Sequence, residues 1–343
     1  MTRVRIRHAL MLAAIVGCAT LGAEAAFPDP LQTSGVGPFR LLDEFETGMA
    51  ASDGLVPSDL QAVGGGMFAG GHLFYAIASE SDTPPAERDA TLPDTAVDWR
   101  FFEPRRIFRS AARAEDLGHD EGTEALAPEA GEDGVFDPWV VQLDDGRARM
   151  YFATSAGIFA AEAPSVDGAF TRMSGPLLAD ARSPSVVRFD GEWLMFHQVD
   201  GEIRLSRSTD GLAFDAGDAI DLGFVPEEGP AEASYGRPGA VVATMPSGRT
   251  VVRVYFEIVY EDGTQQISIA ASEDGIAFER FPGVVFSGDT AGAPMPRLFD
   301  DGTTLLYFTV GKSRRCVDEC RSIVAGVAPF FVRFAEEPTL DEE

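Results

Sequence analysis

Hydrophobic positions along the body of this chain recur in a repeated unit. The unit opens with a residue that precedes proline, continues as an apolar strand, turns at an Asp-Gly pair and ends in an aromatic-rich strand. Clear copies open at Asp137, Ser183 and Ala293, and a copy with a longer turn opens at Arg237. The openings lie roughly 50 residues apart, which is the length of one four-stranded blade with its loops.

A second repeated motif is Ser-x-Asp-Gly-x-x-Phe, at residues 208–214 and 272–278, with a shorter copy at 165–170. Each copy follows a strand in which apolar and polar positions alternate. Glycine accepts the positive φ of a tight turn, and the Ser and Asp oxygens can accept hydrogen bonds from amides of the same loop. We therefore interpret these motifs as turns whose phenylalanine returns to the core, and not as functional sites.

A weaker unit precedes these four. Residues 64–79 resemble its first hairpin, and residues 97–108 resemble a closing strand. Residues 38–45 and 330–334 can pair as terminal strands, and that pairing would remove the exposed edge of an open blade. The sequence therefore predicts an all-β fold: one five-bladed β-propeller of four-stranded antiparallel blades over residues 38–336.

Two acidic segments lack the repeat. Residues 111–134 are rich in Ala, Glu, Asp and Gly, and we expect an exposed loop there between blades one and two. Residues 337–343 form an acidic tail. Carboxylate oxygens in the loop make a calcium site possible, but the EF-hand spacing is absent. We expect no cofactor, with calcium as the weaker alternative.

The charge of the chain limits its partners. Asp and Glu number 55 against 27 Lys and Arg, so the formal net charge is −28. Such a surface repels phosphate backbones and anionic membranes, which argues against a nucleic-acid partner. Hydrophobic residues make up 45% of the 343 residues, enough for a sizeable core, and we expect a monomer.

The N-terminus is typical of an exported protein. Residues 1–17 combine three arginines with an apolar run too short to span a bilayer, as in a signal peptide. The run ends at Cys18, where the sequence resembles a bacterial lipobox, and residues 18–37 would then tether a lipoprotein to the outer membrane. The alternative is ordinary signal-peptidase cleavage at residues 23–25, which would release a secreted or periplasmic protein. Mass spectrometry of the mature N-terminus distinguishes the two.

The other cysteines are Cys316 and Cys320. In an oxidising compartment a close pair of this kind favours a disulfide that closes a short loop. A metal site would need two further ligands, and no histidine lies nearby in the sequence.

Proline-led units with Asp-Gly-x-x-Phe turns resemble the arabinanase–levansucrase–invertase superfamily, with glycoside hydrolase family 43 as the nearest named member. The resemblance covers roughly residues 58–335. It implies three channel-facing carboxylates at the start of the innermost strands of blades one to three: an Asp as general base, a second Asp that tunes pKa values, and a Glu as general acid. Cleavage of a glycosidic bond needs one protonated and one ionised carboxyl group.

The family pattern is carried over only in part. Asp137 matches the blade-two position, whereas the blade-one position falls on Ala62, with Asp59 three residues upstream. Blade three has Ser183 where the family has Glu, and Glu228, in a Glu-Gly-Pro motif, precedes blade four out of register.

Three functional hypotheses follow. The first is an exported propeller that binds a glycan or another ligand in its channel without catalysis, with Asp137, Trp139 and Arg237 as contacts. The second is an active glycoside hydrolase on arabinose-, xylose- or fructose-containing polymers that uses Asp137 with Glu228 or Asp59. The third is a structural lipoprotein without a small-molecule site. Trp139 is either a core residue or a sugar platform, and Asp137 either caps a strand or faces the channel.

Overall fold

The structure is a computed structural model. It describes residues 39–41, 60–79, 104–111, 122–222, 231–244, 249–281, 286–288, 291–298, 304–311 and 327–334. Cys18, Asp59, Glu228, Cys316 and Cys320 lie outside the described residues, so the lipid anchor, the disulfide and two of the proposed carboxylates stay predictions.

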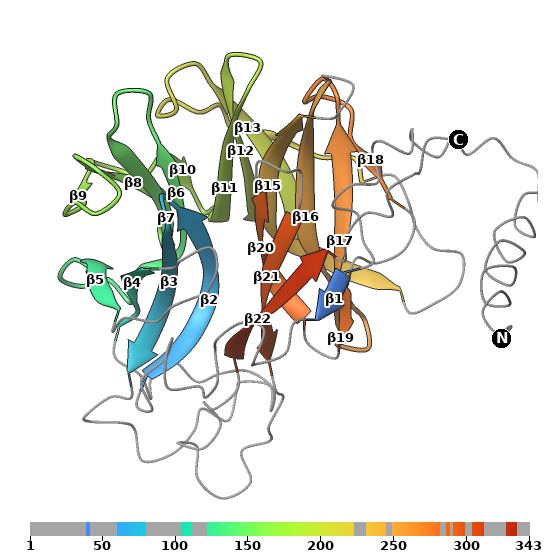
Figure 1. Ribbon diagram of the computed structural model, residues 1–343, viewed down its shortest axis with the longest axis horizontal. Coiled ribbons are helices and arrows are strands. Elements are labelled where there is room, and N and C mark those ends of the chain that lie inside the picture. Colours follow the sequence, from blue (N-terminus) through green and yellow to red (C-terminus); the bar gives the residue numbers. More distant parts are fainter. Residues whose placement is uncertain are drawn as a thin grey trace, which may run out of the picture.

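The described strands form five antiparallel sheets in chain order (Figure 1). The first sheet contains β2 (Leu60–Ala69), β3 (His72–Ser79), β4 (Arg106–Ala111) and β5 (Thr123–Leu126). The second contains β6 (Phe136–Gln142), β7 (Ala148–Thr154), β8 (Gly157–Ala163), β9 (Thr171–Arg172) and β10 (Leu178–Ala179). The third contains β11 (Arg182–Phe189), β12 (Glu192–Val199), β13 (Glu202–Ser208) and β14 (Asp218–Ala219).

The last two sheets follow the same order. The fourth contains β15 (Glu232–Thr244), β16 (Thr250–Tyr260), β17 (Gln265–Ser272), β18 (Glu279–Arg280) and β19 (Phe286–Gly288). The fifth contains β20 (Ala291–Leu298), β21 (Thr304–Gly311), β22 (Val327–Phe334) and β1 (Phe39–Leu41). The second and fourth sheets therefore have a short fifth strand in addition to the four expected.

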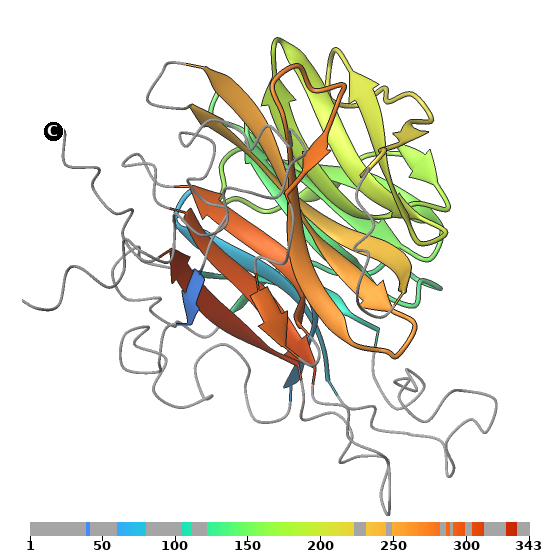
Figure 2. The same ribbon diagram turned by 90° about the vertical axis from the view of Figure 1, so that its right-hand side faces the viewer.

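The first strands of the sheets pack around a common axis. β2, β6, β11, β15 and β20 contact one another in that order, and β20 also contacts β2. The first and last described strands meet in the last sheet, because β1 pairs with β22 in the register Phe39↔Phe334 (Figure 2). The prediction of an all-β propeller is confirmed.

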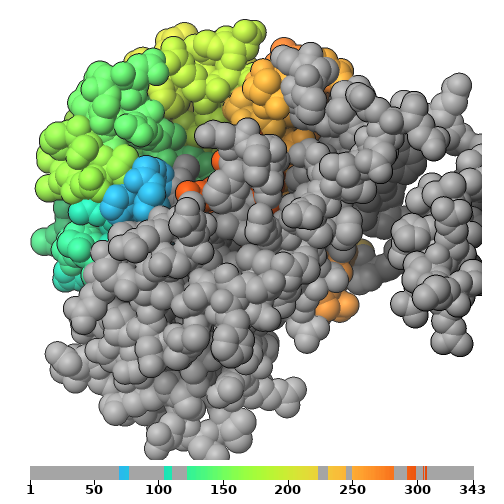
Figure 3. Space-filling view, viewed as in Figure 1, coloured from blue at the N-terminus to red at the C-terminus, as the bar shows by residue number. Residues whose placement is uncertain are grey.

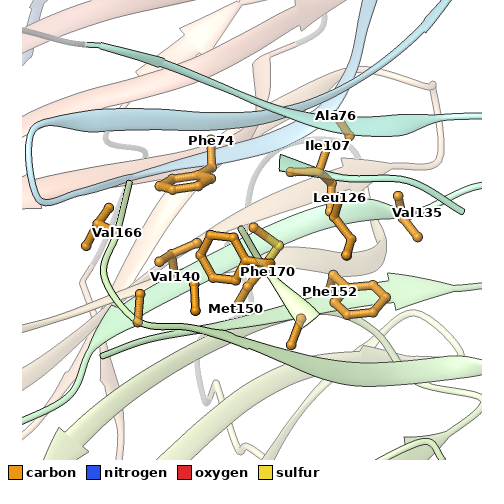
Figure 4. Packing of buried hydrophobic residues seen from close by; sticks show 13 residues of the cluster. Phe74, Ala76, Ile107, Leu126, Val135, Val140, Met150, Phe152, Val166 and Phe170 are labelled. Atoms are coloured by element: carbon orange, nitrogen blue, oxygen red, sulfur yellow. The ribbon is translucent and has the colours of Figure 1, made fainter. Parts of the chain in front are cut away.

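Neighbouring sheets bury apolar side chains between their faces. Side chains from β3, β4 and β5 meet side chains from β6 and β7 in one cluster, in which Phe74, Ile107, Val140 and Phe152 are completely buried (Figure 4). On the surface, the second, third and fourth sheets lie side by side from green to orange (Figure 3). Radial packing therefore gives each sheet the buried faces that an isolated four-stranded sheet lacks.

The hairpin turns form as predicted. Asp190 and Gly191 have φ of 49° and 83°, and Asp200 and Gly201 have φ of 51° and 81°. Positive φ at both central residues is the geometry of a type I′ turn, which matches the twist of the flanking strands.

The Ser-x-Asp-Gly turns also form as predicted, and they connect neighbouring sheets. Asp210 Oδ1 accepts hydrogen bonds from two amides of its own loop, and Ser208 Oγ accepts one from Gly211 N. The phenylalanine of each turn then packs edge-on against an aromatic ring of the preceding sheet. The pairs and their ring-centroid distances are Phe74–Phe170 (5.9 Å), Tyr151–Phe214 (6.2 Å) and Phe196–Phe278 (5.6 Å).

Arginines reinforce the same contacts. Arg109 donates to the Val166 and Gly168 carbonyls, Arg149 to the Asp210 carbonyl, and Arg207 to the Gly275 carbonyl. In each case the donor lies in one sheet and the acceptor in the turn of the next. The turns thus hold the sheets together, a role that depends on tertiary contacts.

Two expectations need correction. Part of the acidic segment at 111–134 is not a loop: Thr123–Leu126 forms β5, whose Glu124 side chain pairs with Arg106 on the adjacent strand. β4 is therefore the third strand of the first sheet and not its closing strand. Pairing with a preformed strand edge overrides the low β-propensity of this segment.

The described residues lack two kinds of feature. They contain no cluster of three or more His, Cys, Asp or Glu side chains that could hold a metal ion. They also contain no helix long and apolar enough to cross a membrane.

Candidate functional site

The residues before the four prolines share an unusual backbone conformation. Asp137, Ser183, Arg237 and Ala293 have φ of 52°, 53°, 44° and 49°. A β-bulge lies at each of these positions, where one residue is extra in the inner strand. Proline cannot donate to the ladder, so pairing is interrupted there and the strand bends. Strain of this kind at four equivalent positions indicates a functional end of the propeller.

Residues of the four bulges together line one small hollow that opens to solvent. The lining residues are Asp137, Pro138, Trp139, Ser183, Pro184, Arg237, Pro238, Ala293, Pro294 and Met295. Four sheets therefore contribute a carboxylate, a hydroxyl, a guanidinium and apolar side chains to a single pocket.

Asp137 is the one carboxylate among the described residues that line this pocket. Its side chain is half-buried, and its Oδ2 accepts a hydrogen bond of 2.7 Å from Ser183 Oγ. The serine at the position where the family has Glu therefore supports the aspartate of the preceding sheet. Asp137 keeps unused acceptor capacity, since an ionised carboxylate can accept several hydrogen bonds.

Glu257, on β16, lies behind the pocket and is 8% exposed. Its Oε2 accepts a hydrogen bond of 3.2 Å from Ala293 N and lies 3.9 Å from Arg237 Nη1. Glu257 approaches the fifth sheet at Gly292. A Cβ at that position would lie 2.1 Å from Glu257 Oε2. The negative charge of Glu257 raises the pKa of Arg237 above its ordinary value.

Two further arginines lie close to Asp137. The Arg105 guanidinium stacks 4.0 Å from the centre of the Phe136 ring. Burial lowers the pKa of Arg105, and the like charges of Arg237 and Arg182 lower it further, against the opposing effect of Asp137. Asp137 therefore acts on the guanidinium groups of Arg105 and Arg237, and Arg182 acts on that of Arg105.

The remaining sequence predictions fall in different places. Trp139 lines the pocket but is only 5% exposed, and its Nε1 donates to the Val186 carbonyl at 2.7 Å, so it packs between the second and third sheets. In the first sheet, the inner strand Leu60–Ala69 has a register shift between Ala62 and Gly66, and its sequence contains no carboxylate. The described part of the site therefore brings together Asp137, Arg237 and one edge of Trp139.

The sequence analysis missed Glu257, Arg105 and Arg182. Glu257 is the single acidic residue in the apolar run of β16, and a carboxylate in a buried strand is a usable signal. Arg182 directly precedes the Ser183 bulge, which could also have been noticed. Arg105 has no counterpart in the repeat, so only the folded chain places it here.

The fold is an all-β propeller that is similar to those of glycoside hydrolase family 43 enzymes. The chain is similar to the α-L-arabinofuranosidase from Lactobacillus brevis, with a TM-score of 0.55 and 11% identity, over 84% of this chain and 95% of that one. It is also similar to the endo-1,4-β-xylanase from Bacteroides thetaiotaomicron, with a TM-score of 0.53 and 12% identity, over 82% and 94%.

A third similar structure is the GH43_1 enzyme from Xanthomonas citri, with a TM-score of 0.51 and 15% identity, over 83% and 90%. No protein-family model matches the sequence, and no curated protein matches it. At these identities the similarity shows the fold alone.

Proposed function

We propose that the five sheets act as five blades of one closed propeller whose channel binds a carbohydrate without hydrolysing it. The observation that supports this is the composition of the pocket: the equivalent bulge positions of the second to fifth sheets carry Asp137, Ser183, Arg237 and Ala293. Hydrolysis needs two carboxyl groups on opposite sides of the scissile bond. Among the described residues that line this pocket, a serine, a guanidinium and a methyl group stand beside a single carboxylate.

These groups suit sugar binding. Asp137 offers carboxylate oxygens to sugar hydroxyls, and Arg237 offers guanidinium N–H donors. The prolines and Met295 provide apolar surface for the C–H faces of a pyranose or furanose ring. The names of the similar structures, which are those of xylan- and arabinose-processing enzymes, support a carbohydrate as the ligand class.

Hydrolysis is the second candidate function. It is favoured by the names of the similar structures. It is also favoured by Asp137, which matches the blade-two Asp of the family in the sequence resemblance. Its second carboxylate would be Glu228, Asp59 or the newly placed Glu257. Against the last, Glu257 is almost completely buried, and the Ala293 amide and Arg237 both approach its Oε2.

The test is binding and turnover on one set of sugars. Asp137→Asn keeps the shape of the side chain and suits positive φ, so it removes only the charge. We expect oligosaccharide binding, measured by calorimetry, to weaken about tenfold, as for loss of one charged hydrogen bond. Asp190→Asn is the matched control, because Asp190 has φ of 49° but is exposed in a hairpin turn.

Turnover is assayed as release of reducing sugar from arabinan, xylan and fructan, and none is expected. Release that is lost in Asp137→Asn would establish the hydrolase instead. Absence of binding across a broad glycan array would reject carbohydrate recognition by this channel.

A further inference from the structure

Arg237 is exposed at the pocket without a hydrogen bond to the described residues. Its side chain is 43% exposed, and its ion-pair partner, Glu257 Oε2, is 3.9 Å away. That distance is too long for a hydrogen bond, and the same oxygen already accepts one from Ala293 N. A guanidinium carries five N–H donors in a planar fork, so Arg237 presents several of them to the pocket.

The backbone at Arg237 is held in a conformation that an arginine does not prefer. A φ of 44° is unfavourable for a residue with a long side chain, and asparagine or glycine would adopt it at lower cost. The bulge nevertheless places an arginine there, followed by Pro238, which lines the same pocket. Strain at a ligand-facing residue is a recurring feature of binding sites.

The charge around the pocket differs from that of the rest of the chain. The described charged groups that face one another there are Arg105, Arg182, Arg237, Asp133, Asp137 and Glu257. Arginines and carboxylates thus balance locally, whereas carboxylates outnumber cations by 55 to 27 in the whole chain. An anion is repelled by the general surface but not at this end of the channel.

Arg182 adds a second set of donors. It is exposed, makes no hydrogen bond or ion pair with the described residues, and is adjacent to Ser183, whose hydroxyl is bonded to Asp137. Its positive charge contributes to the lowered pKa of Arg105, so these two guanidinium groups repel each other. A planar carboxylate held by a guanidinium fork would relieve this like-charge repulsion.

We propose that the channel recognises an acidic saccharide, and that Arg237 binds the carboxylate of its uronic-acid unit while Asp137 accepts hydrogen bonds from the hydroxyls, with Arg182 as a further positive charge near the site. This rests on the proposed carbohydrate-binding function and specifies its ligand.

The test compares tri-galacturonate with its methyl ester, which has the same sugar skeleton without the charge. We expect calorimetry to show the acid binding about tenfold more tightly than the ester at low salt. Raising the salt concentration should narrow the difference, because these arginines are partly solvent-exposed.

Arg237→Gln removes the charge and the fork, and we expect it to abolish the preference for the acid, so that the acid and the ester bind with equal affinity. Arg182→Gln, on an exposed side chain, should reduce the preference even if Arg237→Gln fails to fold. Arg188→Gln is the control, since Arg188 is ion-paired with Asp144 at the other end of its strand and should leave both affinities unchanged.

Each of the other outcomes contradicts a different part of the proposal. Equal binding of acid and ester overturns the acidic ligand and leaves carbohydrate binding intact. Tighter binding of a sulfated neutral trisaccharide than of tri-galacturonate overturns the choice of carboxylate. Failure of every saccharide, charged and neutral, rejects the proposed function itself.

Discussion

His197, on β12, is a titratable residue that the fold has removed from water. It is 1% exposed, its Nε2 lies 2.9 Å from Ser206 Oγ, and its Nδ1 has no partner in the described part of the chain. Burial, and then the positive charge of Arg204, lower the pKa of His197 from 6.5 to about 4. The folded chain therefore holds this histidine in its neutral form at neutral pH.

This lowered pKa predicts a loss of stability in acid. The unfolded chain binds a proton at His197 below about pH 6.5, and the folded chain does so only near pH 4, so the stabilisation is present above pH 6.5 and is lost as the pH falls. The contribution amounts to about 3 kcal/mol. Urea unfolding between pH 7 and 4 should show a shallower decline for His197→Gln than for the natural chain. Identical slopes would contradict the buried neutral state.

At the scale of elements, the sheets are joined by the Ser-x-Asp-Gly-x-x-Phe turns. The turn after β17 places Phe278 edge-on against Phe196 of the third sheet at 5.6 Å, whereas Ile276 in the same turn is 74% exposed. Two apolar residues two positions apart thus have opposite environments, which provides an internal control.

We expect Phe278→Ala to lower the free energy of unfolding by about 2–3 kcal/mol, because the contact between the third and fourth sheets loses its ring. Ile276→Ala should change it by less than about 0.5 kcal/mol. Urea denaturation of both variants measures the difference. Equal effects would show that the turn does not join the sheets.

At the scale of the molecule, the ring is closed by strands from opposite ends of the described chain. β1 supplies the outer strand of the fifth sheet through its pairing with β22, and β20 contacts β2 at the axis. The closing strand has three residues, Phe39–Leu41, so few hydrogen bonds tie the ends together.

Replacing Phe39–Leu41 by three glycines should expose the edge of β22 and lower the free energy of unfolding by about 2 kcal/mol. The same replacement at β14 (Asp218–Ala219) removes an outer strand of similar length that joins no distant segments, and should cost less. Limited proteolysis should then cleave first within the fifth sheet. If the β14 variant is the less stable of the two, the pairing of β1 with β22 is not what closes the ring.

Much of the fold could be predicted from the sequence, because its determinants are local. The prolines after Asp137, Ser183, Arg237 and Ala293 mark the bulge in each inner strand, and Asp-Gly pairs mark the hairpins. Strand β5 could not be predicted, since its acidic sequence becomes a strand only beside the preformed edge of β4.

The site could be predicted only in part. Asp137 follows from its place in the repeat. No local sequence pattern predicts that Glu257, on β16, and Arg105, just before β4, lie near the channel. The sequence by itself determined the repeated unit, its turns and its acidic charge, because these depend on neighbouring residues and composition. Only the tertiary structure decided which charges meet at the channel, because residues far apart in sequence become neighbours there through the packing of whole sheets around one axis.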